Sequence, residues 1–219
     1  MAPLTICCLE VGDYLGHGRL YVETLANMCE RHCPPHTFVC VSDREHCVET
    51  LPADPQLKGW WSKVSLFKPG RFTGNVLYFD LDVVISGDLD GLVELLEFGD
   101  FWALDDFAWP LSRAAETEAL LSKHASGRAL LRLLGGPGTC NSSVMLWRED
   151  AGRDIWEHYS LARISGLHGD QNWITQCMGD RLQLIPQGWA RSYRYGGSGP
   201  ITVHHGEPKP HEVADPAWH

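Results

Sequence analysis

The sequence has no apolar run long enough to cross a membrane, and its eight cysteines include no CxxC pair. A membrane-spanning helix needs about 20 consecutive, mostly apolar residues, and structural zinc sites usually contain closely spaced cysteine pairs. We therefore expect neither a transmembrane segment nor a zinc module. The N-terminal stretch MAPLTICCLE also lacks the basic region and the long apolar region of a secretion signal. These absences predict a cytoplasmic protein with reduced, mostly buried thiols.

Basic residues are scarce as well. The 219 residues include 18 Lys and Arg against 28 Asp and Glu, which gives a net charge of −10. A nucleic-acid-binding protein is expected to carry a basic surface, so we expect no nucleic-acid partner. An anionic substrate would need a bound cation or a few well-placed basic side chains. No internal repeat and no linker divides the chain, so we expect one domain over residues 1–219.

Strand-like and helix-like stretches alternate along the chain, beginning with a β-α-β unit, and this order predicts an α/β fold with a mostly parallel central sheet flanked by helices. Strands are expected at 4–9, 36–41, 75–79, 101–104, 140–148, 182–185 and 201–204. Helices are expected at 19–32, 60–67, 88–98, 114–124, 128–134, 154–161 and 168–178. Residues 186–200 are expected to be irregular.

The stretch NVLYFDLDVVI at residues 75–85 carries the clearest chemical signal. Its apolar part reads as a buried strand that ends at Asp80 and Asp82, and ligands of open α/β sheets bind at the carboxyl ends of strands. If the strand continued through Leu81, both carboxylates would share one face and repel each other. Mg²⁺ and Mn²⁺ are typically held by one or two carboxylates plus substrate phosphates. The stretch therefore predicts a metal–diphosphate site, the alternative being two solvated acids at a strand end.

A second signal lies near the C-terminus, in the segment HHGEPKP at residues 204–210. It contains an imidazole that suits Mn²⁺, a glycine that lets backbone approach a ligand, and a lysine between two prolines that suits phosphate. The alternative is a polar tail with incidental histidines.

Together the two segments resemble glycosyltransferases of the GT-A fold, most closely family 8, the glycogenin-like and lipopolysaccharide galactosyltransferase-like enzymes. The family's DxD pair is here Asp80-Leu81-Asp82, and its late HxGxxKP motif is here His204, Gly206, Lys209 and Pro210. Further matches are Lys63, Asn141-Ser142-Ser143 and Gly169-Asp170-Gln171. The chain departs from the family pattern at Leu167 and His211, where an acid and a Trp are expected.

The resemblance implies a single GT-A, Rossmann-like domain that transfers a hexose from a nucleotide-diphosphate sugar, with UDP favoured, to a glycan or other hydroxyl acceptor. It implies Mn²⁺, or Mg²⁺, held by Asp80, Asp82 and His204, with Lys209 neutralising the leaving diphosphate. The catalytic set would be Lys63, Asp170, Gln171 and Lys209. The donor-binding set would be Leu9, Val11, Tyr14, Asp80, Leu81, Asp82, Asn141, His204, Gly206 and Lys209. Family 8 further implies transfer with retention of anomeric configuration.

Two other readings of the same residues stay open. FDLDVVI also resembles the nucleophile motif of haloacid-dehalogenase-type phosphatases, in which Asp80 would attack phosphorus. A non-catalytic nucleotide-sugar-binding module is the other. Asp105 and Asp106 end a strand expected beside the central one, so either could serve as a base for an inverting enzyme. For Trp60 and Trp61 there are also two interpretations. Either one is a core residue and the other a surface residue, or the pair forms a platform on which a sugar stacks.

Overall fold

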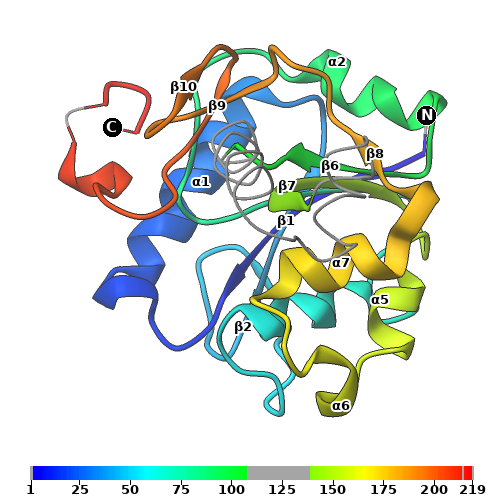
Figure 1. Cartoon of the computed structure of the whole chain (residues 1–219). Coiled ribbons are helices and arrows are strands. Elements are labelled where there is room, and N and C mark those ends of the chain that lie inside the picture. The colour runs from blue at the N-terminus through cyan, green and yellow to red at the C-terminus, as the bar shows by residue number, and fades with distance from the viewer. Residues whose placement is uncertain (1, 108–138, 214, 219) are drawn as a thin grey trace, which may run out of the picture.

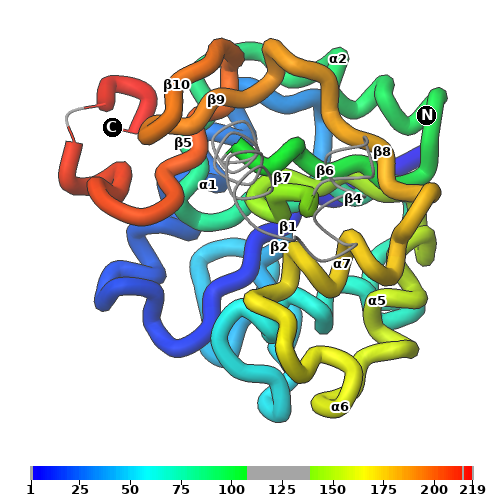
Figure 2. Tube along the Cα trace, viewed as in Figure 1, coloured from blue at the N-terminus to red at the C-terminus, as the bar shows by residue number. Residues whose placement is uncertain are grey.

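The computed structural model describes residues 2–107, 139–213 and 215–218. Within these residues, one sheet has seven strands in the order β3-β2-β1-β4-β7-β6-β8, and a second has four in the order β10-β9-β11-β5 (Figures 1 and 2). The strands are β1 (Leu4–Glu10), β2 (Thr37–Ser42), β3 (Glu49–Pro52), β4 (Asn75–Phe79), β5 (Val83–Ile85), β6 (Phe101–Asp105), β7 (Cys140–Arg148), β8 (Gln183–Leu184), β9 (Ala190–Ser192), β10 (Gly196–Gly197) and β11 (Ile201–Val203). The α-helices are α1 (Gly18–His32), α2 (Asp90–Val93), α5 (Arg153–Glu157), α6 (Leu161–Ile164) and α7 (Asp170–Met178). The 3₁₀ helices are η1 (Tyr14–Gly16), η2 (Gly59–Phe67), η3 (Glu94–Glu97), η4 (Gly179–Arg181) and η5 (Pro210–Glu212).

The large sheet is mostly parallel. Strands β3, β2, β1 and β4 run parallel to one another, and β6 runs parallel to β8, whereas β7 is antiparallel to its two neighbours, β4 and β6. The predicted α/β fold class is therefore confirmed. The expectation that the strand ending at Asp105 lies beside the central strand is wrong, because β7 lies between β4 and β6.

Side chains on both faces of the sheet are buried, because helices cover each face. Alternate residues of β4 point to opposite sides, so Leu77 and Phe79 join the apolar cluster that contains α1, while Val76 and Tyr78 join the cluster that contains α7 and η2. Figure 1 shows α1 on one side of the sheet and α5 and α7 on the other. This arrangement explains why the strand reads as a continuous apolar run.

The strand expected at 75–79 ends at Phe79, before both acids, and does not continue through Leu81. β4 stops at Phe79, a turn closed by the Val83 amide on the Asp80 carbonyl follows (3.2 Å), and β5 then pairs with β11 in the other sheet. The chain leaves the large sheet here because Val83–Ile85 pairs with β11 and forms the edge strand of the smaller sheet. The condition under which Asp80 and Asp82 would share a strand face is therefore not met.

Several local expectations also differ. The helix expected at 60–67 is present as the 3₁₀ helix η2, whereas the helix expected over 88–98 is divided between α2 and η3. The segment expected to be irregular contains β9 and β10, and β3 was not anticipated. The helices expected at 114–124 and 128–134 lie outside the described residues. None of the helices in the described ranges has the length and apolar character needed to cross a membrane.

Candidate functional site

A cavity of about 350 Å³ lies at the carboxyl ends of β1 and β4. Parallel strands end at the same edge of the sheet, so residues far apart in the sequence meet there. The predicted residues that line the cavity are Leu9, Val11, Tyr14, Lys63, Asp80, Leu81 and Asp82. Gly59, Trp60 and Tyr78 complete the lining. Of these, Gly59 and Tyr78 are not among the predicted site residues. Tyr78 could have been found, because it lies two residues before Asp80 in the strand, where side chains two apart point to the same face.

Lys63 ties Asp80 to the α7 side of the cavity. Its buried Nζ lies 2.9 Å from Asp80 Oδ1 and 3.3 Å from Asp170 Oδ2, and it donates to Ser142 Oγ at 3.0 Å. Ser142 Oγ in turn donates to Asp170 at 2.6 Å. Burial alone would lower the pKa of Lys63, but the combined attraction of Asp170 and Asp80 outweighs it, so the pKa of this lysine is raised. The lysine is therefore a fixed positive charge.

Asp82 turns to the opposite side and meets the C-terminal segment. Its Oδ2 accepts from Lys209 Nζ at 2.6 Å and from the Tyr14 hydroxyl at 3.1 Å. Burial and the nearby charge of Asp80 raise the pKa of Asp82, although Lys209 and Tyr14 oppose that rise. The two carboxylates are therefore paired with separate lysines, Asp80 with Lys63 and Asp82 with Lys209.

His204 is held in one tautomer. Its backbone amide donates to the Asp82 carbonyl at 3.0 Å, and its Nδ1 lies 3.2 Å from the Pro208 carbonyl oxygen. Because a carbonyl oxygen only accepts, Nδ1 carries the hydrogen and Nε2 carries the lone pair. That Nε2 is buried and makes no hydrogen bond. Burial lowers the pKa of His204, which keeps the imidazole neutral.

The side chains of Asp80, Asp82 and His204 are of the chemical types that bind a divalent cation. A neutral imidazole whose Nδ1 is fixed by a carbonyl, with a bare Nε2, is the usual state of a metal-ligating histidine. The carboxylates of Asp80 and Asp82 are hard oxygen donors. No group of three His, Cys, Asp or Glu side chains in the described ranges is already arranged to hold a metal. Asp80 and Asp82 are also ion-paired, with Lys63 and Lys209 respectively.

The tip of β1 is organised around Glu10, which sequence reasoning missed. Glu10 is fully buried, accepts from Ser42 Oγ at 2.9 Å and from the Tyr14 amide at 2.9 Å, and lies 3.2 Å from His46 Nε2. Gly18 approaches it so closely that an added Cβ would lie 2.4 Å from Glu10 Oε1. Glu10 thus fixes the loop that presents Val11 and Tyr14 to the cavity.

The other predicted residues do not line the cavity. The Asn141 side chain accepts from the Ser143 amide at 2.9 Å, and Asp170 reaches the cavity through Lys63. Gln171 follows Asp170 in the first turn of α7. Gly206 has φ +82°, a left-handed conformation that glycine adopts without strain.

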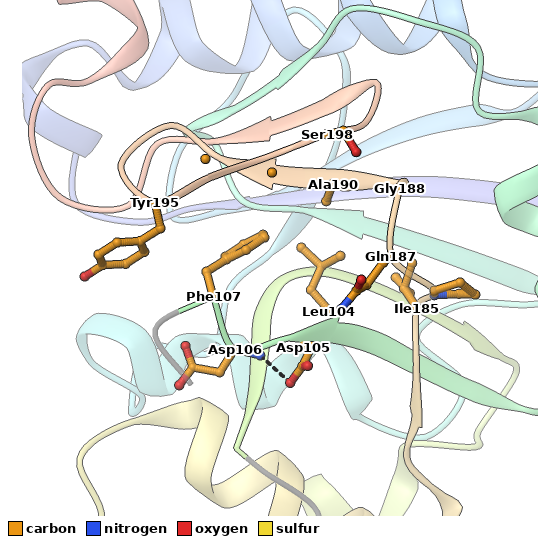
Figure 3. A pocket seen from close by; sticks show the side chains of 13 residues that line it. Leu104, Asp105, Asp106, Phe107, Ile185, Gln187, Gly188, Ala190, Tyr195 and Ser198 are labelled. Carbon is orange, nitrogen blue, oxygen red and sulfur yellow. Dashed lines mark hydrogen bonds between the residues drawn. The ribbon is translucent and has the colours of Figure 1, made fainter. Parts of the chain in front are cut away.

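Asp105 and Asp106 belong to a different cavity, of about 310 Å³, between the end of β6 and the β9–β10 hairpin. In Figure 3, Leu104 and Phe107 point toward the hairpin strand that carries Ala190, whereas the two carboxylates point away from it. Neither aspartate lines the cavity that contains Asp80 and Asp82.

Comparisons with known proteins agree with this architecture. No family model and no curated protein matches the sequence. Solved structures match well: the bifunctional glycosyltransferase WbbM (14% identity, 95% of this chain and 47% of that chain, TM-score 0.64) and the galactosyltransferase LgtC, solved with donor and acceptor sugar analogs (12% identity, 94% and 88%, TM-score 0.61). A third match is mouse xyloside xylosyltransferase 1 (13% identity, 93% and 98%, TM-score 0.60).

The similarity to these glycosyltransferases extends along nearly all of the chain, so the resemblance in fold that the two motifs predict is confirmed. The chain spans about half the length of WbbM but most of LgtC and of the mouse enzyme. At these identities the likeness concerns the GT-A fold.

Proposed function

We propose that the chain is a glycosyltransferase that moves a hexose from a nucleotide-diphosphate sugar, with UDP favoured, to a hydroxyl group of a glycan or another acceptor. The observation that carries the proposal is the meeting of Asp82, His204 and Lys209. Asp82 and Lys209 are 127 residues apart in sequence, and they come together because β5, which follows Asp82, pairs with β11, which precedes His204. Residues 1–219 form the single domain of this proposal. We further propose that the protein works in a reducing compartment, as the cytoplasm is.

The cavity divides into regions with distinct chemistry. Leu9, Val11 and Tyr14 offer an apolar and aromatic surface for a nucleobase, with Glu10 holding their loop. Asp80, Leu81 and Asp82 line the cavity as the charged centre for a diphosphate, with Lys209 paired to Asp82 and Gly206 in the same C-terminal segment. Asn141 would belong with the residues that address the sugar. Lys63, Asp170 and Gln171 border the remaining space, where the sugar would lie.

Asp80, Asp82 and the free Nε2 of His204 would hold Mn²⁺ or Mg²⁺. When bound, such an ion supplies charge neutralisation for the diphosphate leaving group. Lys209, released from Asp82, would donate to a diphosphate oxygen as negative charge builds there, so no acid is needed to protonate the leaving group. Ser142 and Lys63 keep Asp170 fixed, which suits it to orient sugar hydroxyls.

The proposal is tested by incubating the protein with a panel of UDP-hexoses and Mn²⁺ and measuring released UDP. A glycosyltransferase is expected to hydrolyse its own donor slowly when no acceptor is present. Phosphate release from a phosphomonoester, without UDP release, would instead indicate a phosphatase that uses Asp80. Tight binding of UDP-hexose with no release of either product would indicate a binding module.

A further inference from the structure

Trp60 is a large aromatic side chain left at the surface beside the cavity. Its exposed fraction is 61%, yet it lines the same cavity as Lys63 and Asp80. In a 3₁₀ helix, side chains three residues apart lie on the same face. Trp60 and Lys63 are three apart in η2 and line the same cavity, and Lys63 is ion-paired to Asp80 and Asp170. A lone exposed aromatic is ordinary, but its place over a charged cavity indicates a ligand contact.

The position of the indole within the cavity identifies the part of the ligand it would meet. A Cβ added to Gly169 would lie 3.9 Å from three atoms of the Trp60 indole, so the ring lies beside the N-terminus of α7, which begins at Asp170. The surface proposed for the nucleobase, formed by Val11 and Tyr14, lies in the loop directly after β1. Strand order β1-β4-β7 separates the two regions, with the aspartates between them. The indole therefore lies beyond the diphosphate region, on the side left for the sugar.

We propose that Trp60 stacks on the donor sugar ring and that this sugar is an uncharged hexose, an inference that rests on the proposed function. A hexose ring presents C–H groups on its faces, and an indole offers a flat apolar surface to cover them. Of the described residues that line the cavity, Lys63 is the single cation, and it is already paired with two carboxylates. A sugar acid would meet those carboxylates without a free ammonium, so it is disfavoured.

Calorimetry of UDP and UDP-galactose, both with Mn²⁺, tests this role. Trp60→Ala is expected to weaken UDP-galactose binding by about 3- to 10-fold, the value of an aromatic contact, and to leave UDP binding unchanged. Trp60→Phe should recover most of the loss. Phe98→Ala, which removes an exposed aromatic outside the cavity lining, is the matched control and should change neither affinity. The wild type should bind UDP-galactose more tightly than UDP-glucuronate.

Each other outcome has a defined meaning. An equal loss for UDP and UDP-galactose would overturn the inference, since Trp60 would then stack on the nucleoside. Unchanged affinity in Trp60→Ala would overturn it as well, leaving Trp60 as a surface residue. If the wild type binds UDP but prefers UDP-glucuronate, the uncharged-sugar part is wrong while the proposed function stands. Binding of neither nucleotide by the wild type would overturn the proposed function itself, and this role with it.

Discussion

Lys209 Nζ lies 2.6 Å from Asp82 Oδ2, although 127 residues separate the two in sequence. The same ammonium also donates to the His204 carbonyl at 3.2 Å, and the Lys209 amide donates to Glu212 Oε2 at 2.7 Å. Backbone and side chain are therefore both fixed at the start of η5, with the charge beside Asp82. A lysine so placed neutralises one acid of the pair and lies ready to transfer its hydrogen bond to an incoming phosphate.

We predict that Lys209→Met lowers kcat by about 100-fold, the typical cost of removing a donor to a developing oxyanion, while weakening UDP-hexose binding much less. The reason is that charge on the diphosphate is greatest as the bond to the sugar breaks. Steady-state kinetics combined with calorimetry measures the two effects separately. Lys68→Met, at the exposed end of η2, is the control. Losses of equal size in kcat and in binding would mean that Lys209 only binds.

Asp82→Asn should remove Mn²⁺-dependent UDP binding while the protein stays folded. The substitution keeps the size of the side chain and its contact with Tyr14 but removes the charge that an ion requires. Calorimetry of UDP with and without Mn²⁺, and the melting temperature, check the two parts. Asp180→Asn makes the same change at η4, away from the cavity lining. If Asp82→Asn retained the Mn²⁺ dependence, Asp82 would not be a ligand.

The order of the elements and the motif residues could be predicted from the sequence because they depend on local patterns. The apolar run before Asp80 is buried on both faces, as such runs are in covered sheets. The separation of Asp80 from Asp82 could not be predicted in this way. It depends on the pairing of β5 with β11, a strand more than a hundred residues further along the chain.

The same limit applies to the ion pairs. Lys63 and Asp170 were both expected near the donor sugar, but their shared contact with Ser142 depends on how η2, β7 and α7 pack together. Glu10 reads as one more loop acid in the sequence. Only the arrangement of Ser42 and His46 around it shows that it is a buried anchor.

We expect Lys63→Met to lower the free energy of unfolding by about 3 kcal/mol, as removal of one member of a buried ion pair does. The substitution leaves Asp170 buried next to Ser142 with no opposite charge and weakens the support of Asp80. Urea denaturation provides the measurement. Lys68→Met, an exposed change just after the same helix, removes only a cation–π contact with Trp156 and should cost no more than about 1 kcal/mol. Equal costs for the two variants would show that the acids near Lys63 need no compensation.

The eight cysteines are free thiols, and Cys47 is the exposed one. Burial raises the pKa of Cys140 to about 12 and that of Cys177 to about 11, so both stay protonated near neutral pH and react slowly. With a chromogenic disulfide reagent, the folded protein should show one rapid thiol, absent in Cys47→Ser. All eight should react after denaturation without reductant. A lower count after denaturation would indicate a disulfide.

The anomeric outcome follows from how the acids are held. Asp170 is buried, accepts from Ser142 Oγ at 2.6 Å and lies 3.3 Å from Lys63 Nζ, so its charge is balanced and its position fixed. Such a carboxylate orients a sugar better than it removes a proton. Asp105 and Asp106, the acids considered for inversion, line the other cavity.

We therefore expect retention, with a diphosphate oxygen accepting the proton of the incoming hydroxyl. Proton NMR during donor hydrolysis should show the α-hexose first when the donor is an α-linked UDP-hexose, with the β anomer appearing only at the rate of mutarotation. The Asp170→Asn variant should hydrolyse the donor more slowly but release the same anomer, because an orienting residue does not choose the face of attack. Initial release of the β anomer by the wild type would mean inversion. The base would then have to be sought among acids outside the donor cavity, beginning with Asp105 and Asp106.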